Sequence, residues 1–189
     1  MAKDIKTYYE QSYIDNTLRL REVLQTLPSF TKDYFRAVEP TTSAKTRISY
    51  AYDIRVFFHF LIENNPIYHD YTTTQFTLQD LERVEPIDIE EYLEYLKVYK
   101  ADDNQVITNG EKGLARKFSS LRSFYRYFYR HQMIEKNPTI FVDMPKLHDK
   151  AIIRLDTDEV ALLLDFVESA GDHLTGQALN YYKKTRDRD

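Results

Sequence analysis

Arginine and serine side chains recur at helical spacing between residues 116 and 130, where they could bind a polyanion. The row comprises Arg116, Ser119, Ser123, Arg126 and Arg130, with Arg122 on its flank. Guanidinium groups about one helical turn apart, interleaved with hydroxyls, can reach successive phosphates and guanine edges along a groove. Spacing alone favours an ordinary solvated helix face. The near absence of acidic partners on this face favours anion binding instead.

A second candidate anion site lies at residues 42–47. Its polar side chains are Thr42, Ser43, Lys45, Thr46 and Arg47. Hydroxyls, two bases and unpaired backbone amides at the start of a helix form a competent phosphate site. A plain helix N-cap explains the same residues nearly as well, and the two roles are compatible.

Other kinds of chemistry find no support in the sequence. The five histidines are scattered without metal-ligand spacing. The carboxylates between Asp88 and Glu94 alternate with apolar residues, as on the solvated face of a helix, and do not suggest an acid–base pair. No glycine-rich phosphate loop, nucleophile elbow or zinc pattern is present. We therefore expect no catalytic residue, no metal and no cofactor in this chain.

The composition favours a helical protein with a buried core. Hydrophobic residues make up 42% of the 189 residues, and only four residues are Gly. The absence of Cys excludes disulfides and thiolate metal sites and fits a reducing cytosol. A polar first segment and the lack of a long apolar run predict a soluble, cytoplasmic protein without membrane contacts.

The net charge of −4 hides an uneven distribution. Residues 64–103 carry ten acids and three bases, whereas residues 104–137 carry seven bases and two acids. Local fields, more than the average charge, decide whether a polyanion binds. The segment with the arginine row is therefore the basic element of the chain.

Helical patterns dominate the first 131 residues. Residues 16–38 are predicted to be helical in two pieces separated at Pro28. A long amphipathic helix should follow the hydroxyls of residues 41–43 and reach about Glu63. A third helix should start at Pro86, and a fourth should run from about Glu111 to His131. Residues 67–85, apart from a short turn, and residues 101–110 are predicted to be loops.

The remaining segment has the features of an extended exit followed by new helices. Prolines at 138 and 145 predict an extended strap, and residues 146–154 resemble a linker. Asp156 and Glu159 have capping-box spacing ahead of an apolar helix. A last short helix is predicted around residues 179–182.

Several of these segments together resemble tyrosine site-specific recombinases of the phage-integrase type, in particular the Xer group. Residues 41–61 resemble the family's helix with a Ser, Thr, Tyr, Asp-Leu and Phe at fixed spacing, and residues 87–93 are similar to its third helix. Residues 116–125 resemble the family motif Arg-Lys-Leu-Ser-Ala-Leu-Arg-Ser-Phe-Tyr. Asn137-Pro138, residues 144–147 and residues 155–164 resemble its exit and its entry into the catalytic domain. The likeness covers roughly residues 28–170.

The resemblance implies a helical core-binding domain that clamps one face of a recombination half-site. The residues that would face double-stranded DNA are Lys45, Thr46, Arg47, Arg116, Lys117, Ser119, Ser120 and Arg122. Arg126 and Arg130 rest on the helix face alone. Other recombinase protomers are the partners implied for the full-length assembly.

The family's catalytic residues have no counterparts in this sequence. They are an Arg after a Gly-Leu-type turn, a hairpin Lys, a His-x-x-Arg pair, a further His or Trp and a nucleophilic Tyr, and the first would lie just past Asp189. Tyr181 and Tyr182 precede that position, and His173 and Arg186 match nothing in the family pattern. The chain is therefore expected to bind DNA without cutting it.

The sequence predicts an all-α fold: a compact four- to five-helix bundle over residues 1–146, then a linker and one or two helices of a truncated second domain over residues 147–189. The predicted function is sequence-specific duplex binding that positions a tyrosine recombinase on its core site. The first alternative is an all-α protein-interaction module whose basic face docks on an acidic partner. A stand-alone transcription regulator is the second, although no dimerisation element is evident.

Overall fold

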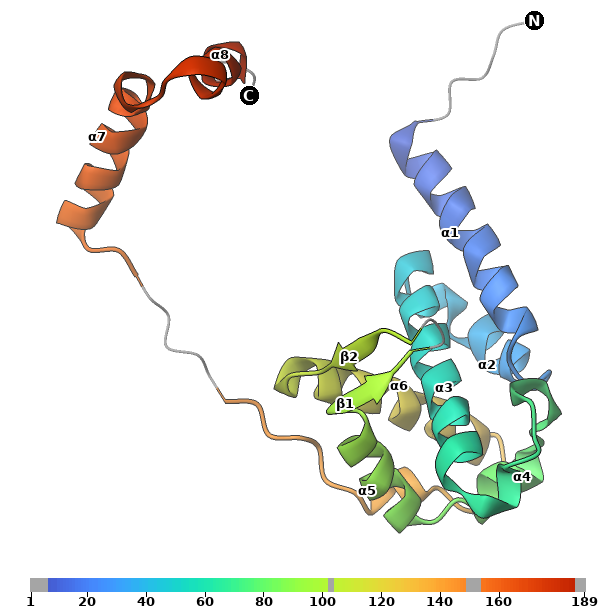
Figure 1. Cartoon of the computed structure of the whole chain (residues 1–189). Helices are drawn as coiled ribbons and strands as arrows, with labels where there is room; N and C mark the ends of the chain where they lie inside the picture. The colour runs from blue at the N-terminus through green and yellow to red at the C-terminus, as the bar shows by residue number, and fades with distance from the viewer. Residues whose placement is uncertain (1–6, 102–103, 149–153, 186–189) are drawn as a thin grey trace, which may run out of the picture. The chain divides into compact units, whose positions relative to one another are not determined.

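The computed structural model describes residues 7–101, 104–148 and 154–185. The chain divides into two compact units, Met1–His148 and Asp149–Asp189. Arg186 and most of the predicted linker lie outside the described residues. The first unit is a helical bundle with one small hairpin, and the second is a pair of helices (Figure 1).

Two helices precede the centre of the bundle. The prediction of two helical pieces separated at Pro28 is confirmed by α1 (Tyr8–Gln25) and α2 (Thr31–Ala37). Helix α1 begins well before residue 16 because Thr7 and Glu10 form a capping box, in which the Thr7 amide donates to Glu10 Oε2 at 2.8 Å.

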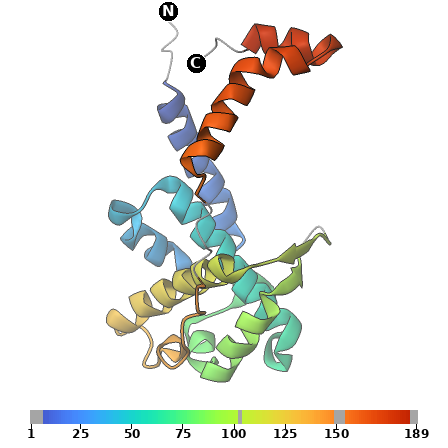
Figure 2. The same ribbon diagram turned by 90° about the vertical axis from the view of Figure 1, so that its left-hand side faces the viewer.

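The two long helices α3 (Ala44–Asn64) and α6 (Glu111–Arg130) form the centre of the bundle, close to their predicted bounds. Helix α6 lies across α3, with α1 and α2 on one side and α5 on the other (Figures 1 and 2). The predicted apolar stripes face each other, because residues three and four apart share a helix face. The fully buried members of these stripes are Ile54, Phe57, Phe58, Leu61, Phe118, Leu121, Tyr125 and Phe128.

The segment between α3 and α5 is more structured than its sequence predicts. It contains the 3₁₀ turns η2 (Pro66–Tyr68) and η3 (Thr73–Gln75), followed by α4 (Leu78–Arg83) and α5 (Pro86–Tyr95). The prediction of a loop was wrong for α4. Its capping box, with the Thr77 amide donating to Asp80 Oδ2 at 2.8 Å, is the local sequence signal for this helix.

A short antiparallel hairpin overlaps the predicted loop at residues 101–110, within which residues 106–108 form a strand. Strand β1 (Val98–Lys100) pairs with β2 (Val106–Thr108), with Tyr99 opposite Ile107. Each strand has one half-buried residue between two exposed ones, and two three-residue strands carry only a weak alternating pattern. The fold class remains all-α, since the hairpin is an appendage of the helical bundle.

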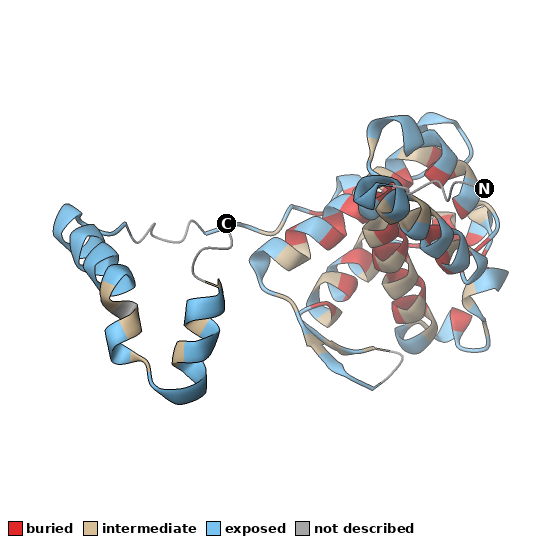
Figure 3. Cartoon of the chain, turned by 90° about the horizontal axis from the view of Figure 1, so that it is seen from above, coloured by how far each residue is buried: buried red, intermediate tan, exposed pale blue. Residues whose placement is uncertain are grey.

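Aromatic rings fill the middle of the bundle. Phe124 of α6 contacts Tyr34 of α2, Phe58 of α3 and Phe128, with ring centroids 5.0 to 6.4 Å apart. Most of these contacts are edge-on, the geometry that aromatic quadrupoles favour. The buried residues concentrate on the inner faces of the bundle helices (Figure 3).

The second unit comprises α7 (Thr157–His173) and α8 (Gly176–Thr185). The capping box predicted for Asp156 and Glu159 is confirmed, with the Asp156 amide donating to Glu159 Oε2 at 2.9 Å. The apolar side chains of α7, such as Leu164 and Phe166, are largely exposed (Figure 3). This helix pair alone therefore buries no core of its own among the described residues.

Candidate nucleic-acid interface

The polar face of α6 presents the predicted row of arginines and serines outward. Ser119, Arg126 and Arg130 are exposed, and Arg122 and Ser123 are half-buried. The helix is strongly two-sided, because the buried residues at positions 118, 121, 125 and 128 turn the positions between them away from the core.

A groove of about 600 Å³ runs along this face. One wall is α6, and the other is the segment after it, which contains the 3₁₀ turn η4 (Pro138–Ile140). The lining residues are Ser119, Arg122, Ser123, Arg126, Tyr129, Arg130, Asn137, Thr139, Ile140 and Met144. Among the described residues, this lining contains three arginines and no acid. We call it the arginine groove.

The three arginines of the arginine groove keep their positive charge available to a ligand. Among the described residues, none of Arg122, Arg126 and Arg130 has an acidic side chain within salt-bridge distance. Arg122 lies over the ring of Phe118, with its Cζ 5.7 Å from the ring centroid. Such a contact leaves the guanidinium edge and its N–H donors free for other groups.

Arg126 and Arg130 also border a second hollow, on the side of α2. This hollow is lined in addition by Tyr34, Val38, Ser123, Tyr127 and His131. The two arginines therefore stand on the ridge between two depressions, where an extended anion could contact them from either side.

Arg116 occupies a different environment from the rest of the row. Its Nη1 and Nη2 atoms donate to the two carboxylate oxygens of Asp53 on α3, at 2.6 and 2.9 Å. Asp53 is buried, and 48% of the Arg116 side chain is exposed. The guanidinium is thus exposed to solvent, but both of its terminal nitrogens already donate to the Asp53 carboxylate.

Lys117 and Ser120, both expected to face DNA, are turned into the protein. Lys117 Nζ donates to Asp53 Oδ1 at 3.1 Å and lies over the Tyr99 ring of the hairpin. Ser120 is fully buried, and its hydroxyl donates to the Lys117 carbonyl at 2.9 Å. Neither side chain is accessible to a duplex here, because positions 117 and 120 lie on the core-facing side of α6.

The start of α3 has the geometry of an N-cap. Ser43 Oγ accepts from the Thr46 amide at 3.1 Å and lies 2.9 Å from the Thr46 hydroxyl. The Thr42 hydroxyl donates to the Val38 carbonyl at 2.6 Å. Lys45 is exposed and forms no salt bridge with a described residue. An N-cap and an exposed cation therefore coexist at this helix end, as the sequence suggested.

Arg47 is the exception at this end of α3. The residue is 3% exposed, and its Nη1 donates to the Glu39 carbonyl at 3.1 Å and pairs with the Glu39 carboxylate at 3.3 Å. Its buried Nε has no hydrogen-bond partner among the described residues. Arg47 therefore joins α3 to the turn before it and is not available to a duplex in this arrangement.

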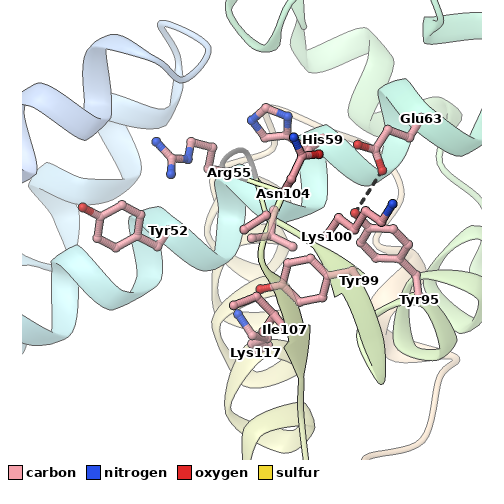
Figure 4. A pocket seen from close by; sticks show the side chains of 12 residues that line it. Tyr52, Arg55, His59, Glu63, Tyr95, Tyr99, Lys100, Asn104, Ile107 and Lys117 are labelled. Carbon is pink, nitrogen blue, oxygen red and sulfur yellow. Dashed lines mark hydrogen bonds between the residues drawn. The ribbon is translucent and has the colours of Figure 1, made fainter.

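A further cavity lies between α3, α6 and the hairpin. It holds about 440 Å³ and is lined by Tyr52, Arg55, His59, Tyr95, Tyr99 and Lys117, among others (Figure 4). Tyr95 and Tyr99 stack with centroids 5.4 Å apart, and the Tyr95 hydroxyl donates to Glu63 at 3.0 Å. No local sequence pattern predicts this cavity, since the hairpin that closes it was not predicted.

The part of the chain that the structure describes contains neither a candidate metal-binding cluster nor a membrane-spanning helix. No group of three or more His, Cys, Asp or Glu side chains is close enough to hold a metal ion. Within residues 7–101, 104–148 and 154–185, every helix is too short or too polar to span a lipid bilayer.

The sequence matches a known protein family over the bundle. Residues 31–132, more than half of the chain, match the family described as phage integrase, N-terminal SAM-like domain. The chain belongs to this family, which agrees with the resemblance noted from its motifs and with its helical fold.

The similar proteins are recombinases by name. A tyrosine recombinase XerC of Caldanaerobacter subterraneus subsp. tengcongensis is 32% identical over 140 residues, which cover 72% of this chain and 38% of that protein. A XerC of Pediococcus pentosaceus is 32% identical over 144 residues, covering 76% and 41%. A tyrosine recombinase of Pseudothermotoga lettingae is 32% identical over 124 residues, covering 66% and 37%. The matches thus span about two-fifths of each relative, and no solved structure matches the chain.

Proposed function

We propose that the helical bundle binds double-stranded DNA and positions a tyrosine recombinase on its recombination site. The arginine groove carries this proposal. In the described part of the chain, its three guanidiniums lie within three helical turns, none pairs with an acid and no acid lines the groove, which fits a polyanion. The names of the similar proteins support a recombinase as the parent activity.

The proposed surface differs from the one that the motifs alone define. Its members are Lys45, Ser119, Arg122, Ser123, Arg126 and Arg130. Arg47, Lys117 and Ser120 are left out because their side chains are buried, and Arg116 because both of its terminal nitrogens donate to Asp53. The hydroxyls of Thr42, Ser43 and Thr46 are left out because they are engaged in contacts at the start of α3. The centre of the surface therefore moves toward the carboxyl end of α6, where Arg126 and Arg130 stand exposed.

The two units have separate roles in this proposal. The bundle, residues 1–146, acts as the core-binding domain, and residues 147–189 form the linker and the start of a catalytic domain. Cutting and rejoining of DNA, and assembly with other recombinase protomers, would belong to the full-length protein. The uncovered apolar face of α7 is what the first helix of such a domain would expose.

Salt dependence of duplex binding tests the proposal. Association of the chain with a random-sequence DNA duplex should weaken steeply as salt rises, with a log–log slope of about −0.9 per phosphate contact. Arg126→Gln and Arg130→Gln should each make that slope shallower by about 0.9. Arg21→Gln is the matched control, since Arg21 is exposed on α1, away from the arginine groove, and should leave the slope unchanged.

Two further outcomes separate the alternatives. Negligible duplex binding even at low salt would refute the proposal and favour an acidic protein partner. Sequence specificity is tested by selecting duplexes from a random pool with the chain itself. Enrichment of a common motif supports site recognition, whereas an unenriched pool reduces the function to general duplex binding.

A further inference from the structure

Asp53 is the acidic side chain that two neighbouring cations of α6 share. It lies on α3 with 2% of its side chain exposed, and it accepts from Arg116 at 2.6 and 2.9 Å and from Lys117 at 3.1 Å. Consecutive residues of an α-helix point about 100° apart. One carboxylate that holds both residues therefore restrains the rotation of α6 about its own axis.

Arg116 should remain paired with Asp53 when a phosphate approaches. The bidentate pair uses a planar guanidinium against a planar carboxylate, which is the strong form of this interaction. Leaving it would strip a buried carboxylate of two charge-assisted hydrogen bonds. A phosphate at the surface offers less in return, because water and salt screen that contact.

The neighbouring cation does not replace Arg116 at the surface. Only 9% of the Lys117 side chain is exposed, and its Nζ lies 5.7 Å from the centroid of the Tyr99 ring. Loss of the Asp53 charge would therefore release one accessible cation, that of Arg116.

We infer that Asp53 is an internal counter-ion that withholds Arg116 from DNA. As a positioning residue it sets the start of the DNA-contacting row at Ser119 and Arg122, one turn further along α6. The inference rests on the proposed duplex binding and reverses the expectation that Arg116 is among its principal contacts. Arg116 is therefore exposed to solvent without being available to a phosphate.

Salt slopes of duplex binding give the test, with a random-sequence duplex as the probe. Arg116→Gln should leave the log–log slope unchanged, whereas Arg126→Gln should make it shallower by about 0.9. Asp53→Asn should make the slope steeper by about 0.9, because it frees Arg116. The double variant Asp53→Asn with Arg116→Gln should return the slope to the wild-type value, a pattern that loss of stability alone would not produce.

Failure of the inference and failure of the proposed function give different results. If Arg116→Gln flattens the slope as much as Arg126→Gln, Arg116 contacts phosphate and the inference is overturned, even where Asp53→Asn fails to fold. If the wild-type chain does not bind the duplex, the proposed function and the DNA role of the pair both fall. The Asp53–Arg116 ion pair can then be tested without DNA, from the urea-denaturation midpoints of Asp53→Asn, Arg116→Gln and the double variant. Non-additive shifts of the midpoint support the ion pair, and additive shifts refute it.

Discussion

Tyr34 of α2 donates its phenolic hydrogen to Ser123 Oγ of α6 at 3.1 Å. This bond joins the buried side of α2 to the polar face of α6, beside Arg126. It leaves the Ser123 hydroxyl proton available to a ligand, because the serine oxygen is the acceptor. Ser123, which is predicted to contact DNA, thus also joins α2 to α6.

Removing one partner of this hydrogen bond should destabilise the bundle more than removing the other. Tyr34→Phe should lower the free energy of unfolding by about 0.5 to 1.5 kcal/mol, since the half-buried Ser123 hydroxyl then turns to water. Ser123→Ala should cost more, about 1 to 3 kcal/mol, because it leaves the buried Tyr34 hydroxyl without a partner. Urea denaturation of both variants measures the difference, and a smaller loss for Ser123→Ala would contradict the bond.

Buried tyrosines should make the fold sensitive to alkali. Burial raises the pKa of Tyr34 and of Tyr68 to about 12, and the pKa values of Tyr92 and Tyr125 well above 10. Between pH 10 and pH 12 the unfolded chain therefore releases protons that the folded chain retains. The stability is fully present below pH 10 and falls as the pH rises, by up to about 1.4 kcal/mol per pH unit for each group.

Urea denaturation at a series of pH values checks this dependence. Tyr68→Phe is the control, because it removes one titrating group and should reduce the alkaline loss of stability. A free energy of unfolding that stays level from pH 10 to pH 12 would show that these hydroxyls are hydrated.

Ser43 should stabilise α3 as its N-cap. Ser43→Ala removes the oxygen that accepts from the Thr46 amide and should lower the free energy of unfolding by about 0.5 to 2 kcal/mol. Ser43→Gly should cost only a few tenths of a kcal/mol, since glycine is tolerated at this position. Equal losses for the two variants, measured by thermal or urea denaturation, would point to a role other than capping.

Neutralising Arg47 and neutralising Lys45 should have different effects on the salt slope of duplex binding. Arg47→Met should leave the salt slope of duplex binding unchanged and alter stability by about 1 kcal/mol or less, because the Glu39 carboxylate that loses its partner is 56% exposed and is hydrated by water instead. Lys45→Gln should make the slope shallower by about 0.9 with little effect on stability. Paired salt titrations and urea denaturations of the two variants decide this, and a shallower slope for Arg47→Met would place that side chain on DNA.

Local sequence patterns determined the helices of this protein. The apolar stripes around Phe57 and Phe118, and the cap at Ser43, are visible in the sequence because helix periodicity and capping involve residues within one turn of each other. The same periodicity separated the polar side of α6 from its core side. The hairpin and α4 were missed, since both are too short to show a sustained period.

Tertiary structure alone decided which cations are available. Arg116, Lys117 and Arg126 are all basic residues of one helix, but Asp53, more than sixty residues earlier, pairs with the first two and not with the third. Arg47 is likewise buried against Glu39 at the turn before α3. The sequence therefore established the helical fold, the family and the existence of a basic face. The members of that face depend on long-range packing, because burial and ion pairing join residues whose distance along the chain carries no local signal.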